Sequence, residues 1–214
     1  MMKFNYTNYI ISQFRLEGGI KIMLLALRKR VIAIGASTGG VEAIEALISR
    51  FPASIPPVVL VIHMPIGFTK LLAERLDGLY NVAVKEAKTG DLLECGQVLI
   101  AEAGKHMITL NKDGALVVEC YVGSKVQHSM PSVDVLFESV AKVLHKNAIG
   151  IILTGMGADG ARGLLAMRKA GASTIGQNRD TCVIYGMPKI AKEMGAVEYE
   201  LPLNEICDKV LSLL

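Results

Sequence analysis

Three side chains with the chemistry of a hydrolase each come shortly after an apolar run of the sequence. Ser37 follows the run 31–34, His63 follows 58–62 and Asp159 follows 149–153. In an open parallel sheet, ligands and catalytic groups gather beyond the carboxyl ends of the strands. If these runs are neighbouring strands, the hydroxyl, the imidazole and the carboxylate share one edge of the sheet.

Together these groups are what a serine hydrolase requires. A serine hydroxyl is a poor nucleophile until a base takes its proton, and an imidazole can do so near neutral pH. A carboxylate then fixes the imidazole tautomer and stabilises the imidazolium that forms. Small residues surround Ser37, so a substrate carbonyl can approach it. The helix that opens at residues 38–40 offers backbone amides to an oxyanion.

Each of the three residues also has an ordinary structural interpretation. Ser37 fits a helix cap, His63 a strand end with satisfied hydrogen bonds, and Asp159 a glycine-rich turn. The pattern Gly35-x-Ser37-x-Gly39 fits a nucleophile elbow, although that pattern is short and common. The conjunction of all three favours catalysis. The chain order Ser, His, Asp differs from the Ser, Asp, His order of α/β-hydrolases, which excludes that fold.

The elements that must position these groups are predicted by hydrophobic periodicity. Strands are expected at 31–34, 58–62, 149–153 and about 173–176. Segments of helical period separate them, which predicts an α/β fold: a doubly wound, mostly parallel sheet with helices on both faces. Residues about 82–122 contain shorter strands and a turn at 112–114. There we expect an antiparallel hairpin at one edge of the sheet.

Three helices are expected to bury one apolar stripe each. The stripes are Val41, Ile44, Leu47 and Ile48 in the first helix, Phe68, Leu71, Leu72, Leu76 and Leu79 in the second, and Val133, Leu136, Phe137, Val140, Val143 and Leu144 in the third. The third stripe is the most regular of the three.

The remaining candidate residues are weaker. His106 begins a short strand and is expected at the surface or a sheet edge, while His128 and His145 lie in a polar loop and near a helix end. Arg162 is expected to be solvated. The four cysteines show neither C-x-x-C nor paired histidine spacing. We therefore expect no zinc site and no disulfide framework, but reduced, buried thiols.

Composition excludes several classes of protein. The 214 residues are 51% hydrophobic and 20% charged, which suits one globular domain. A net charge of +3 is too small to indicate nucleic acid, and the triplet 28–30 is expected to be a solvated basic face. No apolar stretch reaches the roughly 18 residues of a membrane-spanning helix, and the run 20–27 is too short. We therefore expect a cytoplasmic protein without membrane insertion.

The first 30 residues differ from the rest in composition and periodicity. They are expected to form an N-terminal extension, with Met23 a plausible alternative start, ahead of a domain at 31–214.

With these residues in view, the sequence resembles the catalytic domain of chemotaxis protein-glutamate methylesterases of the CheB type. The resemblance runs from about Val31 to the C-terminus. It is carried, in order, by IGASTGG, IHMPIGFT, LAERLD, KHM, PSVDVLFESVA, ILTGMGADGA, IGQN and YGMPKIA. Several separate motifs in register make it specific.

The resemblance implies a fold, a reaction and a set of site residues. Ser37, His63 and Asp159 match the family's catalytic positions, and Thr38, Gly39 and the Met156 backbone would hold the oxyanion and substrate. The implied reaction removes methyl esters from glutamate side chains of chemoreceptor cytoplasmic helices, with deamidation of receptor glutamines as a related activity. It implies no metal or organic cofactor.

Two departures from the family pattern affect these expectations. Members usually carry an N-terminal phosphorylation-receiver domain, whereas here only 30 residues precede the first strand and no aspartate occurs before Asp77. Regulation through a receiver domain is therefore not expected. Met130 stands where an arginine is usual before P-S-V-D, and IAEAGKHM lacks the usual proline-glycine turn. Both departures concern substrate contacts more than catalysis.

Two other functions fit parts of the pattern. A dinucleotide-binding oxidoreductase would need G-x-G-x-x-G, but Ser37 occupies the second glycine's place, and the second strand is followed by His63 in place of an acidic residue. A non-catalytic receptor-binding scaffold derived from the esterase is the main alternative. Retention of all three triad residue types argues against it.

Overall fold

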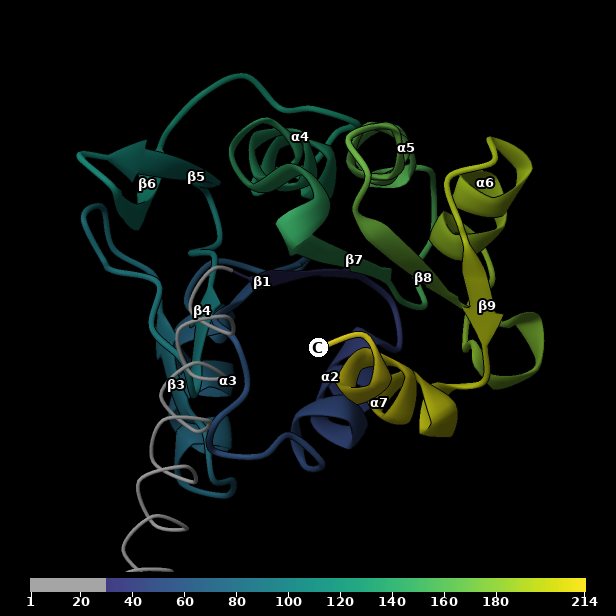
Figure 1. Cartoon of the computed structure of the whole chain (residues 1–214), viewed down its shortest axis with the longest axis horizontal. Helices are drawn as coiled ribbons and strands as arrows, with labels where there is room; N and C mark the ends of the chain where they lie inside the picture. The colour runs from purple at the N-terminus through teal and green to yellow at the C-terminus, as the bar shows by residue number, and fades with distance from the viewer. Residues whose placement is uncertain (1–29) are drawn as a thin grey trace, which may run out of the picture.

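A parallel sheet forms the centre of the molecule. The computed structural model describes residues 30–214, and within this range seven strands form one sheet (Figure 1). They are β1 (Val31–Ala36), β2 (Val58–Ile62), β3 (Ala83–Glu86), β4 (Gln97–Ile100), β7 (Ala148–Ile152), β8 (Ser173–Gln177) and β9 (Tyr199–Leu201). Their spatial order is β3-β4-β2-β1-β7-β8-β9, and all neighbours run parallel. The predicted doubly wound α/β fold is confirmed.

Two layers of helices cover the sheet. They are α2 (Gly40–Ile48), α3 (Phe68–Asp77), α4 (Val133–Leu144), α5 (Ala161–Lys169), α6 (Met187–Glu193) and α7 (Leu203–Ser212), with 3₁₀ turns η1 (His145–Asn147) and η2 (Arg179–Thr181). Figure 1 shows α4, α5 and α6 on one face and α2 and α7 on the other. In the central strand, Ile32 and Ile34 enter one core while Val31 and Ala33 enter the other. A strand buried on both faces reads as one continuous apolar run, as this one does.

The helix stripes were predicted with different success. In α2, Ile44, Leu47 and Ile48 are buried, and α4 buries nearly all of its predicted stripe. The α3 stripe was partly wrong: Leu72 and Leu76 are buried as predicted, whereas Phe68, Leu71 and Leu79 are largely exposed, and Leu79 lies beyond the helix. The helix also buries Thr69 and Ala73. Its apolar residues span more of the circumference than one edge of the sheet can cover.

The middle segment divides into two parts. Strands β3 and β4 join the main sheet in parallel, so an antiparallel arrangement is wrong for them. Strands β5 (His106–Lys112) and β6 (Ala115–Tyr121) form the predicted antiparallel hairpin as a separate two-stranded sheet. Asp113 and Gly114 form its turn, both with positive φ. Met107 and Val118 bury the hairpin against the core beneath α4.

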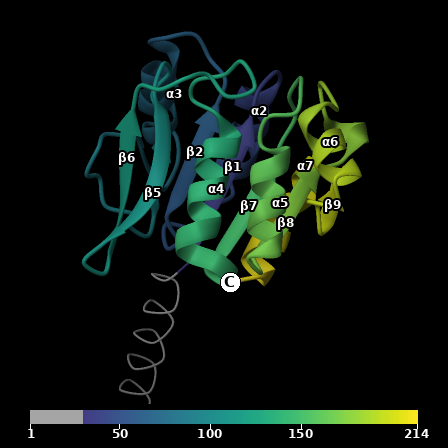
Figure 2. The ribbon, with the colours of Figure 1, turned by 90° about the horizontal axis from the view of Figure 1, so that it is seen from above.

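The strands that precede the three candidate residues are adjacent. β1 lies between β2 and β7, and the chain fills the sheet on the β2 side before it crosses to the β7 side. Figure 2 shows these strands side by side behind α4 and α5. The direction of the winding reverses at β1, so a crevice is expected beyond its carboxyl end.

Some predictions fall outside this range. The N-terminal extension, the apolar run 20–27 and the first two residues of the basic triplet lie outside the described residues. Among residues 30–214 no helix has the length and apolar character to cross a membrane.

We predict that Gly163→Ala destabilises the protein. Gly163 lies where α5 crosses α4, and an added Cβ would meet Phe137 Cβ at 2.6 Å and the Asp134 carbonyl oxygen at 2.8 Å. Forcing the helices apart should lower the free energy of unfolding by about 1–3 kcal/mol, despite alanine's better helix propensity. Urea unfolding measures the change.

Gly78→Ala is the matched control. Gly78 has right-handed helical φ and ψ, and its nearest atoms to an added Cβ are 3.7 and 3.8 Å away. This variant should be neutral or more stable by up to about 1 kcal/mol. Equal effects of the two substitutions would contradict close helix contact at Gly163.

Candidate active site

Backbone hydrogen bonds fix the three strand ends relative to one another. The His63 amide donates to the Ala36 carbonyl at 3.2 Å, so the ends of β1 and β2 stay together. On the other side of β1, the Ser37 amide donates to the Thr154 carbonyl at 3.0 Å. Ser37 therefore projects from the strand end that lies between those carrying His63 and the loop to Asp159. The three strand ends are thus adjacent, whereas among residues 30–214 the Ser37 hydroxyl makes no hydrogen bond to His63.

The turn that holds Ser37 is built from small residues because the protein itself crowds it. Gly39 has φ 76°, and an added Cβ would lie 2.5 Å from Val183. A Cβ on Gly155 would lie 2.7 Å from the Cβ of Ser37. Ser37 is half-buried, and within residues 30–214 its hydroxyl has no hydrogen-bond partner. The helix cap of α2 is Gly39, so a capping role for Ser37 is excluded.

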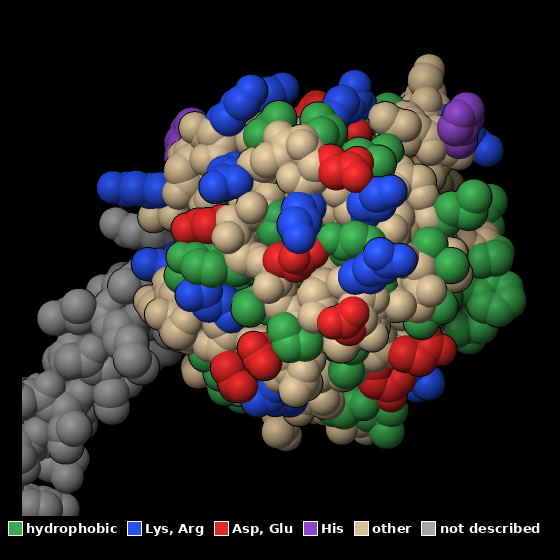
Figure 3. Space-filling model, turned by 90° about the vertical axis from the view of Figure 1, so that its right-hand side faces the viewer, with side chains coloured by type: hydrophobic (Ala, Val, Ile, Leu, Met, Phe, Trp, Pro, Cys, Tyr) green, Lys and Arg blue, Asp and Glu red, His purple; other side chains and the backbone are tan. Residues whose placement is uncertain are grey.

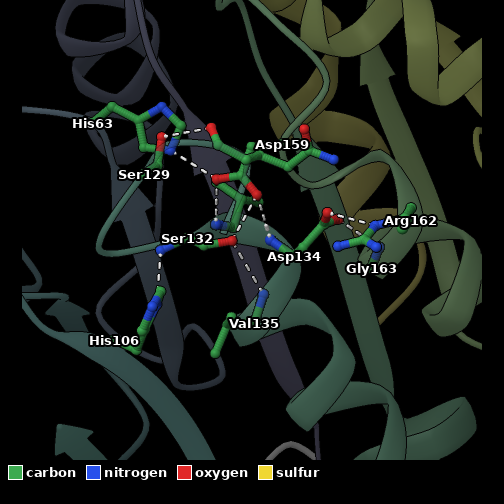
Figure 4. Close-up of polar contacts among 11 residues, drawn as sticks. His63, His106, Ser129, Ser132, Asp134, Val135, Asp159, Arg162 and Gly163 are labelled. Atoms are coloured by element: carbon green, nitrogen blue, oxygen red, sulfur yellow. Dashed lines mark hydrogen bonds and ion pairs between the residues drawn. The ribbon is translucent and has the colours of Figure 1, made fainter. Parts of the chain in front are cut away.

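His63 and Asp159 form a direct pair. His63 Nε2 lies 2.8 Å from Asp159 Oδ2, and because a carboxylate only accepts, Nε2 carries the proton (Figure 4). Nδ1 of the neutral ring is then left as the basic nitrogen. The two ring nitrogens thus exchange the roles that they have in serine proteases of the chymotrypsin type.

The Asp159 carboxylate lies at the N-terminus of α4. Its Oδ1 accepts from Ser132 Oγ at 2.7 Å and from the Asp134 amide at 3.0 Å, while Oδ2 also accepts from the Val133 amide at 2.8 Å. Ser132 is the N-cap, and its Oγ accepts from the Val135 amide at 3.4 Å. A helix N-terminus presents free amides and a positive dipole end, which suits an anion.

These contacts decide the charge of Asp159. Burial alone would raise its pKa, but hydrogen bonds from His63, the Asp134 amide, Ser132 and the Val133 amide outweigh it, so the pKa is lowered. The carboxylate is therefore ionised at neutral pH. It can hold the His63 tautomer and stabilise a positive charge on that ring.

His106 is part of the same network. It begins β5, an edge strand of the two-stranded sheet, as one of the two predicted positions had it, but the other, a surface position, was wrong. It is 2% exposed, its Nδ1 accepts from the Ser132 amide at 3.2 Å, and its Nε2 donates to the Ser124 carbonyl at 2.9 Å. Figure 4 shows the resulting chain from His106 through Ser132 and Asp159 to His63. The prediction that His106 begins a strand is confirmed. The residue is buried because the hairpin docks against α4, and the local sequence pattern does not reveal such a tertiary contact.

The expected oxyanion donors are partly occupied. The Gly40 amide donates to the Ser37 carbonyl at 2.7 Å and is not available. The Thr38 carbonyl accepts from Thr154 Oγ1 at 2.9 Å, which fixes the orientation of the Thr38 peptide next to Ser37. Met156 lies on the loop beyond β7 and is 76% exposed. The Thr38 and Gly39 amides thus stay the candidates nearest to Ser37.

Thr154 is a residue whose role the sequence analysis missed. It is buried and joins three segments: its amide donates to Gln177 Oε1 at 2.8 Å, its hydroxyl donates to the Thr38 carbonyl, and it accepts from the Ile184 amide at 3.0 Å. A polar residue directly after a buried strand was the available signal.

Asp134 and Arg162 form a second polar pair behind the site. The Asp134 carboxylate is buried and accepts from the Gly163 amide at 2.8 Å and from Arg162 Nε at 3.1 Å. Arg162 is largely exposed, as expected, but is tied to this carboxylate. The pair joins the first turns of α4 and α5. No cluster of three or more metal-binding side chains occurs among residues 30–214.

Comparison with known proteins gives a consistent result over the whole domain. The family model described as CheB methylesterase matches residues 32–210. A protein-glutamate methylesterase/protein-glutamine glutaminase of Syntrophomonas wolfei is 55% identical over 184 residues, which are 86% of this chain and 54% of that protein. A protein of the same description from Rhizobium johnstonii is 49% identical over 185 residues, 86% of this chain and 53% of its own length. The chain therefore spans about half the length of these relatives.

A solved structure agrees with the fold. The crystal structure of the Thermotoga maritima CheB methylesterase catalytic domain matches with a TM-score of 0.84 and 36% sequence identity. The match covers 86% of this chain and 98% of the other chain.

We predict that Asp159→Asn costs more stability at neutral pH than in acid. Because the folded-state pKa lies below the unfolded value of about 3.9, the ionised carboxylate contributes stability that is complete above that value. This contribution disappears as the pH falls through the folded pKa. The difference in free energy of unfolding between wild type and variant should therefore shrink below about pH 4. Urea unfolding across pH 2.5–7, chosen to span roughly both sides of the transition, measures it.

The exposed Asp180 gives the control substitution, Asp180→Asn, whose effect should be small at every pH. A stability gap for Asp159→Asn that is constant or widens in acid would contradict an ionised carboxylate in the folded state.

We predict that His106→Ala destabilises the protein by about 1–3 kcal/mol, since it leaves the buried Ser132 amide and the Ser124 carbonyl without their partner. His106→Asn should cost less, because the Asn amide oxygen can replace Nδ1 as acceptor. His145→Asn changes an exposed histidine and should stay within about 0.5 kcal/mol of wild type. Chemical unfolding of all three tests this order, and equal effects of the His106 and His145 substitutions would refute it.

Proposed function

The chain belongs to the CheB methylesterase family, and we propose that it hydrolyses the γ-methyl esters of glutamate side chains in the cytoplasmic helices of chemoreceptors, with release of methanol. The relatives' names also support deamidation of protein glutamines. Residues 31–214 would form the catalytic domain, which would work in the cytoplasm, where these receptor segments lie.

One observation carries this proposal. At the strand end next to the one that carries His63 lies Ser37, whose hydroxyl has no partner among residues 30–214, and one ring nitrogen of His63 is held by a buried, ionised carboxylate. A carboxylate, an imidazole and a hydroxyl in this order favour acyl transfer through a covalent intermediate.

In the acylation half of the proposed reaction, Nδ1 of His63 takes the proton of the Ser37 hydroxyl while its oxygen attacks the ester carbonyl carbon. Negative charge develops on the carbonyl oxygen, and the Thr38 and Gly39 amides, with the Met156 backbone, stabilise it. The carbonyl re-forms, the bond to the methoxy oxygen breaks, and His63 gives its proton to the leaving group as methanol. Removal of one oxyanion donor from subtilisin, an unrelated serine hydrolase, raises the barrier by about 2.7–4 kcal/mol.

In the second half, water attacks the acyl-enzyme and gives a proton to His63. The bond to the Ser37 oxygen breaks, the serine regains its proton, and a glutamate carboxylate leaves. A glutamine side chain would follow the same course with ammonia in place of methanol. These steps use only water and groups of this chain.

The surface around Ser37 suits a protein substrate. Ile66, Met156 and Val183 lie on loops beside the candidate site and are 81%, 76% and 66% exposed. Figure 3 shows hydrophobic side chains gathered at the right-hand edge of the face beside α6 and β9, whereas charges of both signs alternate over the rest. Exposed apolar patches of this kind typically mark interaction sites.

We predict that Ser37→Ala abolishes methanol release from methyl-esterified receptor cytoplasmic fragments. Removal of the serine from a comparable triad lowers kcat by about 10⁶-fold, because no other group can form the acyl intermediate. Gas chromatography of released methanol measures the reaction.

Ser49→Ala is the matched control, because Ser49 is exposed at the end of α2 and its hydroxyl only donates to the Ala46 carbonyl. It should keep full activity. Methanol release that survives Ser37→Ala would overturn the assignment of the nucleophile. If wild type releases none and a phosphonofluoridate fails to label Ser37, the protein is a binding scaffold.

A further inference from the structure

A hollow of about 300 Å³ adjoins His63, and the segment that leads into the N-terminus of α4 lines part of it. Met64 and Pro65 form one wall, and Met130 and Pro131 form the other. His63 itself lines the hollow, so a substrate whose ester carbonyl lies at Ser37 would place its neighbouring side chains there.

The ionisable groups that line this hollow besides His63 are both basic. They are Lys125 and His128, and no aspartate or glutamate lines it. Within the described part of the chain, Lys125 has neither an ion pair nor a hydrogen bond. Its ammonium group is therefore free to meet a carboxylate from a ligand.

The two basic residues belong to a tight turn, residues 125–129, which we term the basic turn. The Val126 amide donates to the Ser129 carbonyl at 3.1 Å and the Ser129 amide to the Val126 carbonyl at 2.9 Å. The two residues between them, Gln127 and His128, have φ of 49° and 64°. Such two-residue turns favour asparagine and glycine, because other residues are strained at positive φ. Strained residues beside a reactive group often have a function there.

The basic turn is anchored on both sides. His106 donates to the Ser124 carbonyl at 2.9 Å on one side, and on the other the Gly104 amide donates to the Met130 carbonyl at 3.0 Å. The anchors hold the backbone of the turn beside the hollow, so the positions from which Lys125 and His128 extend are fixed before a substrate arrives. A preorganised contact loses less ordering entropy on binding than a mobile one.

We infer that Lys125 and His128 form a subsite for a carboxylate that flanks the reactive methyl ester on the substrate. The inference rests on the proposed function and names its substrate class: a methyl-esterified glutamate with an unesterified acidic side chain about one helical turn away. The aliphatic stem of that side chain would pack between Met64, Pro65 and Met130. The carboxylate would meet the Lys125 ammonium and accept a hydrogen bond from the His128 ring.

Paired peptides test the subsite. Synthetic peptides with one glutamate γ-methyl ester carry either Glu or Gln three or four residues to either side, and are otherwise identical. Wild type should favour the Glu peptide by about five- to tenfold in kcat/KM, mainly through KM, as expected for a partly exposed charge-assisted contact. Lys125→Met, which keeps most of the apolar stem, should bring this ratio to about one, and Lys125→Glu should favour a peptide with Lys in the same place. Added salt should reduce the wild-type preference.

Lys146→Met is the control, since Lys146 is exposed at η1, after the C-terminal end of α4. It should keep the wild-type preference. A wild type without preference for Glu, or a Lys125→Met variant that retains it, would overturn the subsite.

Binding measurements test the subsite independently of the proposed hydrolysis. The same peptide pairs are titrated into Ser37→Ala, which cannot turn them over, and their dissociation constants are compared by calorimetry. The Glu peptide should bind about five- to tenfold more tightly, and the additional change Lys125→Met should remove the difference. This ratio decides the subsite even if wild type hydrolyses neither peptide, an outcome that would count against the esterase alone.

Discussion

A buried carboxylate that must stay ionised is the constraint on which the site depends. Removing Asp159 from water without compensation would favour its neutral form, which could not hold the His63 tautomer. The N-terminus of α4 supplies two backbone amides and the Ser132 hydroxyl, and His63 supplies the fourth contact. The position of a whole helix is thereby tied to the charge of one side chain.

The N-terminus of α4 can reach the Asp159 carboxylate only because two glycines next to Val133 have no side chain. A Cβ on Gly35 would lie 2.2 Å from Val133 Cγ1, and one on Gly160 would lie 2.5 Å from the same atom. The small residues around Ser37 were expected to admit a substrate. At Gly35 and Gly39 the neighbours are instead Val133 and Val183. These glycines allow protein segments to approach, and the open side of the site is left to the Ser37 hydroxyl.

The sequence analysis could place Ser37, His63 and Asp159 together because each follows a run that is apolar on both faces of a strand. That pattern is local, and the switch-point rule for parallel sheets converts it into proximity. The burial of His106 and the exposed flank of α3 could not be predicted this way. Both depend on which neighbour covers which face, and a hairpin docked on α4 or a helix at a sheet edge leaves no periodic signal in its own segment.

The site therefore divides into a fixed back and an open front. On the inner side of the His63 ring, the side chains of Asp159, Ser132 and His106 form hydrogen bonds with one another's residues and with backbone groups. Changing one of these partners therefore leaves another buried polar group without a hydrogen bond. In front, the Ser37 hydroxyl and the Lys125 ammonium have no intramolecular partner in the described chain. Groups of the first kind must be ordered before a substrate binds, because reorganisation during the reaction would raise the barrier. Groups of the second kind gain their contacts only from a ligand, and on this fold the turns that carry them are held by backbone hydrogen bonds to the fixed part of the site.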